Sequence, residues 1–148
     1  MVVVPQLVIF TGIPASGKST FYQERFFTTH VRVNLDMLKT RHREALLVGA
    51  CIAGRTSFVV DNTNLQPADR ARYIPVARAA GFSVVGYVFQ TPIADALTRN
   101  AERTGKQRVP DAAIRNAVSR FEWPTLTEGF DSLWLVRLGD TGFVEEPL

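Results

Sequence analysis

A glycine-rich segment near the start of the chain carries the residue types of a phosphate-binding loop. Gly12 and Gly17 stand five residues apart and are followed by Lys18 and Ser19, which matches the pattern Gly-x4-Gly-Lys-Ser/Thr. Glycines allow backbone angles that direct successive N–H groups into one concavity, where anionic oxygens bind. The lysine is expected to reach the β- and γ-phosphates of a nucleoside triphosphate, and the serine hydroxyl to bind Mg²⁺. ATP and Mg²⁺ are therefore the predicted cofactors.

The flanks of this loop supply the strand and the helix that the pattern requires. An apolar run over residues 7–10 precedes it, within a buried strand expected over 6–11, and helical spacing continues to about residue 27. The partial positive charge of a helix N-terminus favours a phosphate at this point. A chance glycine turn that only caps a helix does not account for the complete pattern with its flanks. The loop residues expected to contact the nucleotide are Gly12, Ile13, Pro14, Ala15, Ser16, Gly17, Lys18, Ser19 and Thr20.

An aspartate follows an apolar strand that is expected over residues 57–60. In open α/β sheets, ligands bind beyond the carboxyl ends of the strands, which is where Asp61 would lie. A carboxylate at this place commonly holds Mg²⁺ in proteins with a phosphate-binding loop. Asp61 and Ser19 are therefore the candidate metal ligands, and an Asx turn or a helix cap is the alternative role for Asp61.

A second aspartate, Asp36, follows the alternating strand expected over residues 30–34 and begins a helical segment that extends to about residue 53. One interpretation is that it serves only as the N-cap of that helix. The other is that it is the general base, which accepts the proton of an attacking hydroxyl while a γ-phosphoryl group is transferred. The residues by themselves leave both interpretations open.

Basic residues gather after the fourth expected strand, in a helix–loop–helix over about residues 99–120. Arg99 and Arg103 are four residues apart and would share one helix face. Such a segment is typical of a lid that closes over phosphates, in which an arginine stabilises the transferred phosphoryl group. A solvated charged face is the alternative. The other basic residues of the segment are Lys106, Arg108, Arg115 and Arg120.

Strands and helices alternate along the chain, which indicates an α/β fold. The expected architecture is a P-loop NTPase, with a parallel sheet of about five strands between helices and a lid as in nucleoside monophosphate kinases. At 148 residues a single domain over 1–148 is expected. Pro75 should kink or shorten the helix expected over residues 67–80. The strands are expected at residues 6–11, 30–34, 57–60, 82–89 and 133–138.

Composition narrows the class of protein. Hydrophobic residues make up 46% of the chain and charged residues 21%, as in ordinary globular domains, and no apolar run approaches the length of a membrane span. The first residues lack the basic region and cleavage site of a signal peptide. The single cysteine, Cys51, excludes an internal disulfide and a cysteine-based zinc site, and it fits the reducing cytoplasm. The net charge of +3 favours a polyanionic partner only weakly.

The chain resembles the 5′-kinase domain of the polynucleotide kinase family, within a group of P-loop kinases similar to AAA_33. The similarity extends from residue 8 to about residue 130. The phosphate-binding loop is common to many families, whereas Asp-Asn-Thr-Asn at 61–64 and Phe-Glu-x-Pro-Thr at 121–125 are far more specific. The other segments that carry the resemblance are residues 33–36, 70–73, 77–81, Arg99-Asn100 with Arg103, 109–110 and 128–130.

The resemblance implies an ATP-dependent kinase that transfers the γ-phosphoryl group to the 5′-hydroxyl of a DNA or RNA end. Asp36 would be the general base for that hydroxyl, and Arg103 would contact the donor phosphates with Arg99 beside it. Lys18 would neutralise phosphate charge, and Asp61 would be the strand-end acid near Mg²⁺. No Asp-x-Asp-Gly-Thr phosphatase signature is present, so kinase activity alone is expected.

Two positions depart from the pattern of that family, and two other functions remain as alternatives. Leu35 stands where the family often has arginine, and Lys39 stands where its phage member has an arginine that binds the acceptor's phosphate. A lysine offers a point charge in place of a bidentate fork, which bears on acceptor preference. The first alternative is a P-loop kinase of a small molecule, such as a sugar, an antibiotic or, as in zeta toxins, a nucleotide sugar. The second is a nucleotide-binding regulatory module without transfer activity.

Overall fold

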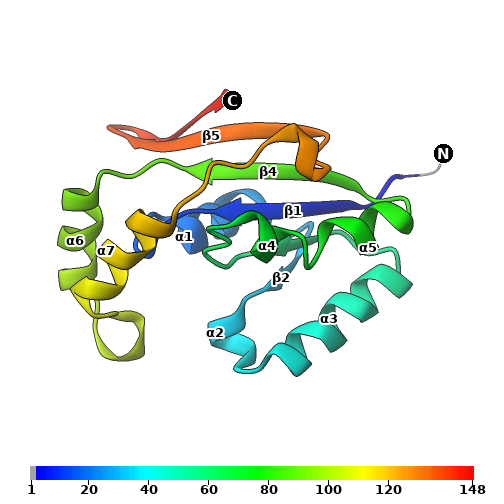
Figure 1. Cartoon of the computed structure of the whole chain (residues 1–148), viewed down its shortest axis with the longest axis horizontal. Coiled ribbons are helices and arrows are strands. Elements are labelled where there is room, and N and C mark those ends of the chain that lie inside the picture. The colour runs from blue at the N-terminus through cyan, green and yellow to red at the C-terminus, as the bar shows by residue number, and fades with distance from the viewer. Residues whose placement is uncertain (1–2) are drawn as a thin grey trace.

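The computed structural model describes residues 3–148, which form a six-stranded β-sheet in the order β2-β3-β1-β4-β5-β6 (Figure 1). The first five strands are parallel, and β6 runs antiparallel to β5 at one edge. The expected domain begins at residue 1, and its first two residues lie outside the described range. The strands are β1 (Gln6–Thr11), β2 (Val31–Val33), β3 (Phe58–Val60), β4 (Ser83–Phe89), β5 (Ser132–Gly139) and β6 (Gly142–Pro147).

Helices cover both faces of the sheet and one of its ends. In Figure 1, α6 and α7 stand side by side beyond the carboxyl ends of β1 and β4. No helix in residues 3–148 combines the length and the apolar character needed to cross a membrane. The α-helices are α1 (Lys18–Arg25), α2 (Leu35–Leu38), α3 (Arg41–Ala53), α4 (Pro67–Arg70), α5 (Ile74–Ala79), α6 (Ile93–Glu102) and α7 (Asp111–Arg120). Two 3₁₀ helices are η1 (Gly105–Gln107) and η2 (Leu126–Glu128).

The central strand β1 is buried on both faces because it pairs with β3 on one side and β4 on the other. Alternate side chains of a strand point to opposite faces. Leu7 and Ile9 join the core that contains residues of α3 and α5, whereas Val8 and Phe10 join the core that contains Phe21 of α1. A strand with helices on both faces is apolar at every position, which explains the continuous apolar run.

A third apolar cluster joins the predicted lid to the phosphate-binding loop. Ile13 and Ala15 of the loop pack with Ala96 of α6 and with Ile114 of α7. Because these contacts are apolar and buried, the ends of α6 and α7 that face the sheet are fixed by packing. The packing therefore holds α6 and α7 next to the phosphate-binding loop.

The five predicted strands are confirmed, with ends that agree to within one residue. Residues 36–53, expected to be one helix, form α2 and α3 instead, because Lys39 adopts a φ of 76° and Thr40 caps the N-terminus of α3. The prediction of one continuous helix is wrong. Residues 67–80 form α4 and α5, with Pro75 in the first turn of α5, where its missing N–H leaves no hydrogen bond unmade. The expected shortening at Pro75 is confirmed.

The sixth strand, β6, was not among the expected strands, so the sheet has six strands where about five were expected. A tight turn pairs Gly139 with Gly142, whose φ of 125° favours glycine. Phe143 of β6 packs edge-to-face against Phe21 of α1, with ring centroids 5.2 Å apart. The added strand thus supports the helix that begins at the phosphate-binding loop.

A buried ion pair connects the segment after β3 to the segment after α7. Arg70 is fully buried and makes a two-pronged contact with Glu128, through Nε to Oε1 at 2.7 Å and Nη2 to Oε2 at 3.1 Å. Its Nη1 also donates to the carbonyl oxygens of Asn64 and Glu122. A buried guanidinium is tolerated because every side of it has an oxygen acceptor.

We predict that Glu128→Gln lowers the free energy of unfolding by about 3–5 kcal/mol, because it leaves the buried charge of Arg70 unpaired. Urea unfolding followed by circular dichroism measures this change. The matched control is Glu146→Gln, which breaks an ion pair with Arg137 in which both side chains are about half exposed. This control should cost no more than about 1 kcal/mol. Equal effects of the two variants would show that Arg70 does not depend on Glu128.

Candidate active site

The phosphate-binding loop joins the carboxyl end of β1 to the N-terminus of α1. A Cβ on Gly12 would come within 2.9 Å of both the Cβ of Phe89 and the Oγ of Ser16, so the site admits only glycine without a shift. Gly17 caps α1 with a φ of 91°, in the left-handed region. The other loop residues are arranged as follows: Ile13, Ala15 and Ser16 are buried, Pro14 and Lys18 are half-buried, and Ser19 and Thr20 are exposed.

Lys18 folds back over the loop. Its Nζ donates hydrogen bonds to the carbonyl oxygens of Gly12 at 3.0 Å and Ile13 at 2.7 Å. Burial lowers the pKa of Lys18 from 10.5 to about 8, while the charges of Asp61 and Asp36 raise this pKa and that of Arg103 lowers it. Three residues predicted from other parts of the chain therefore lie within electrostatic reach of the lysine.

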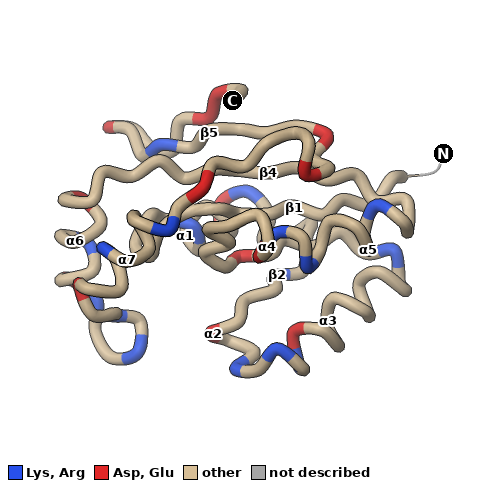
Figure 2. Tube along the Cα trace, viewed as in Figure 1, with Lys and Arg blue, Asp and Glu red and all other residues tan. Residues whose placement is uncertain are grey.

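Of the two arginines of the predicted lid, Arg99 contacts the phosphate-binding loop, whereas Arg103 donates to the carbonyl oxygen of Gln107. Arg99 donates from Nη1 to the carbonyl oxygen of Ala15 at 3.3 Å. Arg103 lies one residue beyond the end of α6 with extended backbone, so the two arginines do not both lie on the helix as expected. Asn100, fully buried between them, holds the turn of the lid through two hydrogen bonds with the backbone of Val109. Basic residues line the loop between α6 and α7 (Figure 2).

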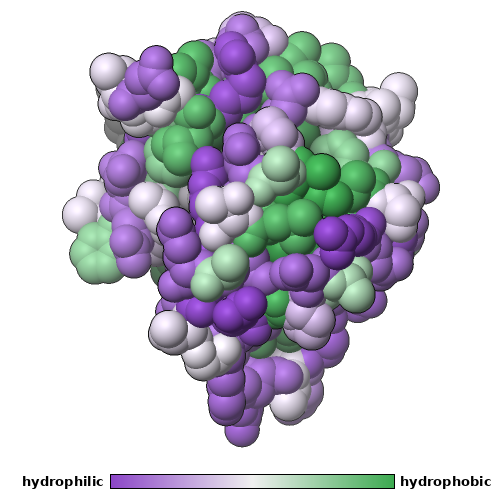
Figure 3. Space-filling model, turned by 90° about the vertical axis from the view of Figure 1, so that its left-hand side faces the viewer, coloured by the Kyte–Doolittle hydropathy of each residue, from purple (hydrophilic) through white to green (hydrophobic). Residues whose placement is uncertain are grey.

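Two clefts lie at the carboxyl end of the sheet, and the smaller one includes a residue of the phosphate-binding loop. The larger, of about 420 Å³, is at the carboxyl ends of β4 and β5, and Arg99 is part of its wall. The smaller, of about 170 Å³, is mostly apolar and is lined in part by Ile13, Phe121 and Trp123. Figure 3 shows this end of the molecule, where an apolar area is bordered by hydrophilic residues. The other residues of the larger cleft are Gln90, Thr91, Pro92, Asp95, Arg137 and Leu138.

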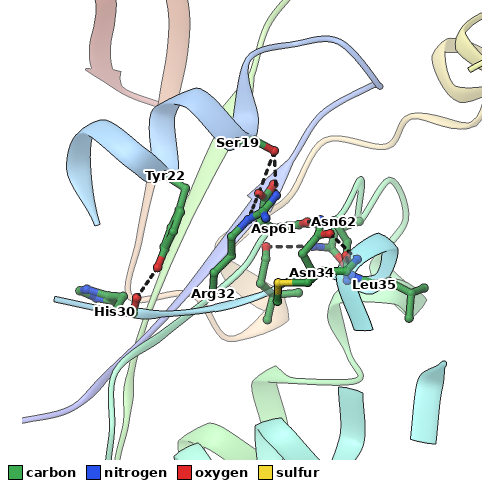
Figure 4. Close-up of polar contacts among 11 residues, drawn as sticks. Ser19, Tyr22, His30, Arg32, Asn34, Leu35, Asp61 and Asn62 are labelled. Carbon is green, nitrogen blue, oxygen red and sulfur yellow. Dashed lines mark hydrogen bonds and ion pairs between the residues drawn. The ribbon is translucent and has the colours of Figure 1, made fainter. Parts of the chain in front are cut away.

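The two predicted metal ligands lie together, with an arginine between them (Figure 4). Ser19 Oγ donates to Asp61 Oδ2 at 3.2 Å. Arg32 of β2 donates from Nε to Asp61 Oδ2 and from Nη2 to Ser19 Oγ, both at 2.9 Å. Arg32 was not among the residues predicted from the sequence. The signal that was available is an arginine between two valines in a short strand, where it must face away from both neighbours.

Ser19 and Asp61 fit a magnesium ion that arrives with a nucleotide. Mg²⁺ usually takes one or two protein oxygens and completes its shell with phosphates and water. Within residues 3–148, no group of three or more His, Cys, Asp and Glu residues is arranged to hold a metal. The hydroxyl of Ser19 and the carboxylate of Asp61 are therefore the oxygen donors beside the loop that such an ion would use.

Asp36 is exposed in the first turn of α2. The residue that caps this helix is Asn34, whose Oδ1 accepts a hydrogen bond from the N–H of Met37 at 2.9 Å. The interpretation of Asp36 as the N-cap is therefore wrong. Its carboxylate is not committed to the helix terminus, and its charge acts on Lys18. The role of Asp36 as general base remains a proposal.

A hydrogen-bond network positions α2 against β3. Asn34 Nδ2 donates to the carbonyl oxygen of Asp61 at 2.7 Å, and the N–H of Leu35 donates to Asn62 Oδ1 at 2.9 Å. Asn62 in turn donates to Glu44 of α3 at 3.0 Å, a buried carboxylate that sequence analysis had not singled out. These contacts determine where Asp36 lies relative to the loop.

Tyr73 completes this network from the N-terminus of α5. Its hydroxyl donates to Glu44 Oε1 at 2.8 Å and accepts from Arg41 Nη1 at 3.1 Å. Burial, with the hydrogen bond to Glu44, raises the pKa of Tyr73 to about 12. Its ring belongs to the core, so its position between polar groups of α3 and β3 was not evident from the sequence.

The sequence also matches a known protein family. A model of the family AAA_33, described as an AAA domain, matches residues 39–124, which is more than half of the chain. The chain belongs to the AAA_33 family. The expected relationship to this group of P-loop kinases is thereby confirmed.

This AAA_33 domain is similar in sequence to two curated proteins. It is 30% identical over 132 residues to a bifunctional polynucleotide phosphatase/kinase of Schizosaccharomyces pombe. The aligned region covers 86% of this chain and 32% of that protein. It is 26% identical over 145 residues to an L-seryl-tRNA(Sec) kinase of Methanococcus maripaludis. Here the aligned region covers 84% of this chain and 56% of that protein. The chain thus spans about a third of the length of the first relative and just over half of the length of the second.

Solved structures show the same P-loop kinase fold. Kti12 of Chaetomium thermophilum, crystallised with ADP-AlF3, has a TM-score of 0.68 at 18% identity and covers 90% of each chain. A gluconokinase of Sinorhizobium meliloti has a TM-score of 0.63 at 17% identity, covering 92% of this chain and 84% of its own. The predicted fold class is confirmed. At these identities the similarity concerns the fold of the AAA_33 domain and does not extend to its acceptor.

We predict that Asn62→Ala releases α2 from β3, because it leaves the N–H of Leu35 and the buried carboxylate of Glu44 each without one partner. The free energy of unfolding should fall by about 2–3 kcal/mol. Amide hydrogen exchange at Leu35 should become faster, which a merely local loss of stability elsewhere would not produce. The control Asn116→Ala, at an exposed position of α7, should leave both quantities unchanged. Unchanged exchange at Leu35 in Asn62→Ala would contradict the positioning role.

Proposed function

We propose that this AAA_33 domain is an ATP-dependent polynucleotide 5′-hydroxyl kinase. The observation that carries the proposal is the placement of Lys18 and the hydrogen-bonded Ser19–Asp61 pair at the loop, where the charges of Asp36 and Arg103 also act on the lysine. A base for the acceptor, a cation for the donor phosphates and a lid arginine are the groups that in-line phosphoryl transfer requires. They come from three separate parts of the chain.

The nucleotide would bind with its phosphates in the loop and its nucleoside toward the larger cleft. N–H groups of the loop and the N-terminus of α1 point at the phosphates. The phosphate oxygens replace the carbonyl oxygens that Lys18 now contacts. Arg99 borders both the loop and the cleft, so it can contact the donor from the side of the lid. Mg²⁺, when bound at Ser19 and Asp61, neutralises phosphate charge.

Transfer follows from the position of Asp36. Its exposed carboxylate accepts the proton of the acceptor hydroxyl, and the oxygen attacks the γ-phosphorus. A bond forms between that oxygen and phosphorus as the bond from phosphorus to the β,γ-bridging oxygen breaks, and ADP leaves. Lys18 and Arg103 stabilise the charge that spreads over the phosphoryl oxygens. Residues 99–120 act in this proposal as a lid, which excludes water from the reaction.

The acceptor class is supported by charge near Asp36 and by the relatives. Lys39 and Arg43 are exposed at the junction of α2 and α3, and Lys106 and Arg108 are exposed on the lid loop. Figure 2 shows these two basic segments on either side of α2. Nucleic acid backbones bind such exposed cations and release counterions. The names of both curated relatives contain a nucleic acid, as polynucleotide or as tRNA.

A small-molecule alcohol is the second candidate acceptor. Leu35 presents no charge at the N-terminus of α2, and Lys39 supplies a point charge in place of a guanidinium fork. Fewer fixed contacts to an acceptor phosphate would suit an uncharged alcohol such as a sugar. Competition between 5′-OH strands and sugars as acceptors separates this candidate from the first.

We predict label transfer from γ-labelled ATP to short 5′-OH DNA or RNA, and none to 5′-phosphorylated versions of the same strands. Asp36→Asn should reduce the transfer rate by about 10²–10⁴-fold, because the proton acceptor is lost. The affinity for ATP, measured by calorimetry, should stay unchanged. Asp140→Asn, in the exposed turn between β5 and β6, is the control and should retain full activity.

Other outcomes of this assay identify the alternatives. Transfer to a sugar or an aminoglycoside, with none to the 5′-OH strands, would replace the polynucleotide kinase by the small-molecule kinase. ATP binding without transfer to any acceptor would leave the regulatory module. Loss of ATP binding in Asp36→Asn would mean that this aspartate is structural.

We predict that the affinity for ATP decreases as the pH rises above 8. The pKa of Lys18 is lowered to about 8 in the free protein, so the lysine is protonated below that pH and loses its charge above it. Phosphate charges stabilise the protonated lysine, and ATP keeps its own charge in this range because its last phosphate titrates well below pH 8. Calorimetry should therefore show Kd increasing about tenfold from pH 7 to pH 9, with proton uptake on binding. Lys18→Met should bind weakly at both pH values, and a constant Kd in the wild type would contradict the shifted pKa.

A further inference from the structure

Arg32 bridges Ser19 and Asp61, which are also hydrogen-bonded to each other, and so places a guanidinium cation at the candidate metal site. Its Nε and Nη2 donate to Asp61 Oδ2 and Ser19 Oγ, the two oxygens that fit a magnesium ion. The side chain of Asp61 is only 2% exposed, so its negative charge requires a positive partner in the free protein. The guanidinium supplies that charge in the absence of metal.

The strand β2 fixes the direction from which Arg32 enters. Arg32 is aligned with Val59 of β3, whose side chain belongs to the core on the α1 side of the sheet. Its guanidinium lies 5.9 Å from the ring centroid of Tyr22 on α1, and the Tyr22 hydroxyl donates to the carbonyl oxygen of His30 at 2.6 Å. The arginine therefore reaches the pair along the underside of α1 (Figure 4).

The side chain of Arg32 can also move away from this pair into solvent. Its side chain is 28% exposed, and β2 is the edge strand of the sheet, so solvent lies beside it. A metal ion at Ser19 Oγ and Asp61 Oδ2 would compete with Arg32 for both oxygens, because each of them accepts a guanidinium N–H and Asp61 Oδ2 also accepts the Ser19 hydroxyl. The two cations also repel each other at this separation.

We propose that Arg32 is an internal competitor of the divalent metal, which neutralises Asp61 in the free protein and leaves the Ser19–Asp61 pair when metal and nucleotide bind together. The inference rests on the magnesium part of the proposed function and adds a residue that sets metal affinity. Metal alone binds poorly because it must displace Arg32 with two protein ligands. Metal with nucleotide binds well because the phosphates supply further ligands and attract the cation.

The test measures Mn²⁺ binding to the full chain, with and without ADP, from the electron paramagnetic resonance signal of free Mn²⁺. In the wild type we expect binding with ADP and little without it. Arg32→Met keeps an apolar stem against Tyr22 and removes the charge, so Mn²⁺ should bind about tenfold or more tightly with ADP. It should also bind detectably without ADP. Arg32→Lys keeps a charge but reaches only one of the two oxygens, and it should be intermediate.

A second readout does not involve nucleotide. In the presence of a chelator, Arg32→Met should lower Tm because the buried carboxylate of Asp61 loses its ion-pair partner and keeps only the hydrogen bond from Ser19. Added Mg²⁺ should raise the Tm of this variant and leave that of the wild type nearly unchanged. Arg25→Met is the matched control, since Arg25 also pairs with a carboxylate, Glu145, and stands over an aromatic ring of α1. It should not alter Mn²⁺ affinity.

Any of the following results would overturn the inference. Equal Mn²⁺ affinity of wild type and Arg32→Met in the presence of ADP would remove Arg32 from the competition and leave the magnesium site intact. Weaker binding in Arg32→Met would mean that the arginine assists the metal. No Mn²⁺ binding with ADP in any variant would overturn both this inference and the proposed metal site. If Arg32→Met does not fold, tighter binding in Arg32→Lys than in the wild type supports the inference, and equal binding overturns it.

Discussion

The four residues after β3, Asp61–Asn64, hold the candidate site together, because each of them bonds to a different element. Parallel strands end at this edge, and the loops beyond them have no sheet partners, so side chains and isolated backbone groups supply the hydrogen bonds that fix the loops. The last of the four takes a φ of 44°, a conformation that asparagine adopts more readily than most residues. Their partners are Ser19 of α1 for Asp61, Leu35 of α2 for Asn62, Gly12 of the loop for the carbonyl of Thr63, and Phe10 of β1 for Asn64.

Charges at this edge are compensated within the chain before any ligand arrives. Lys18 donates hydrogen bonds to backbone carbonyl oxygens, and Arg32 forms an ion pair with Asp61. A phosphate would compete with those carbonyl oxygens for Lys18, and a metal ion would compete with Arg32 for Asp61. Ligand binding therefore exchanges one set of contacts for another, and its free energy is the difference between them. The packing of α6 and α7 against Ile13 also brings Arg99 to the loop, and the charge of Arg103 lowers the pKa of Lys18.

The regular part of the fold was predictable because period and turn chemistry are local signals. The five parallel strands are apolar runs or alternating segments, and Pro75 shortens its helix through a property of its own ring. The break at Lys39 was not predictable, since a positive φ at a lysine is imposed by the contacts of α2 and α3 and not by the residue. The strand β6 was missed for a similar reason. Its sequence includes two glutamates and a proline, which suit a strand only because it lies at an edge.

By itself, the sequence determined the phosphate-binding loop. The glycines act through their backbone freedom and the lysine through its charge, and neither property depends on the neighbouring residues. It also determined that Asp36 and Asp61 follow strands, and hence that they lie at the carboxyl edge. Only the tertiary structure decided that Asn34, and not Asp36, caps α2, since capping depends on which side chain points back at the free N–H groups. It alone placed Arg32 against both Ser19 and Asp61. These two contacts depend on the register of the sheet, because Arg32 is 13 positions from Ser19 and 29 positions from Asp61 in the sequence.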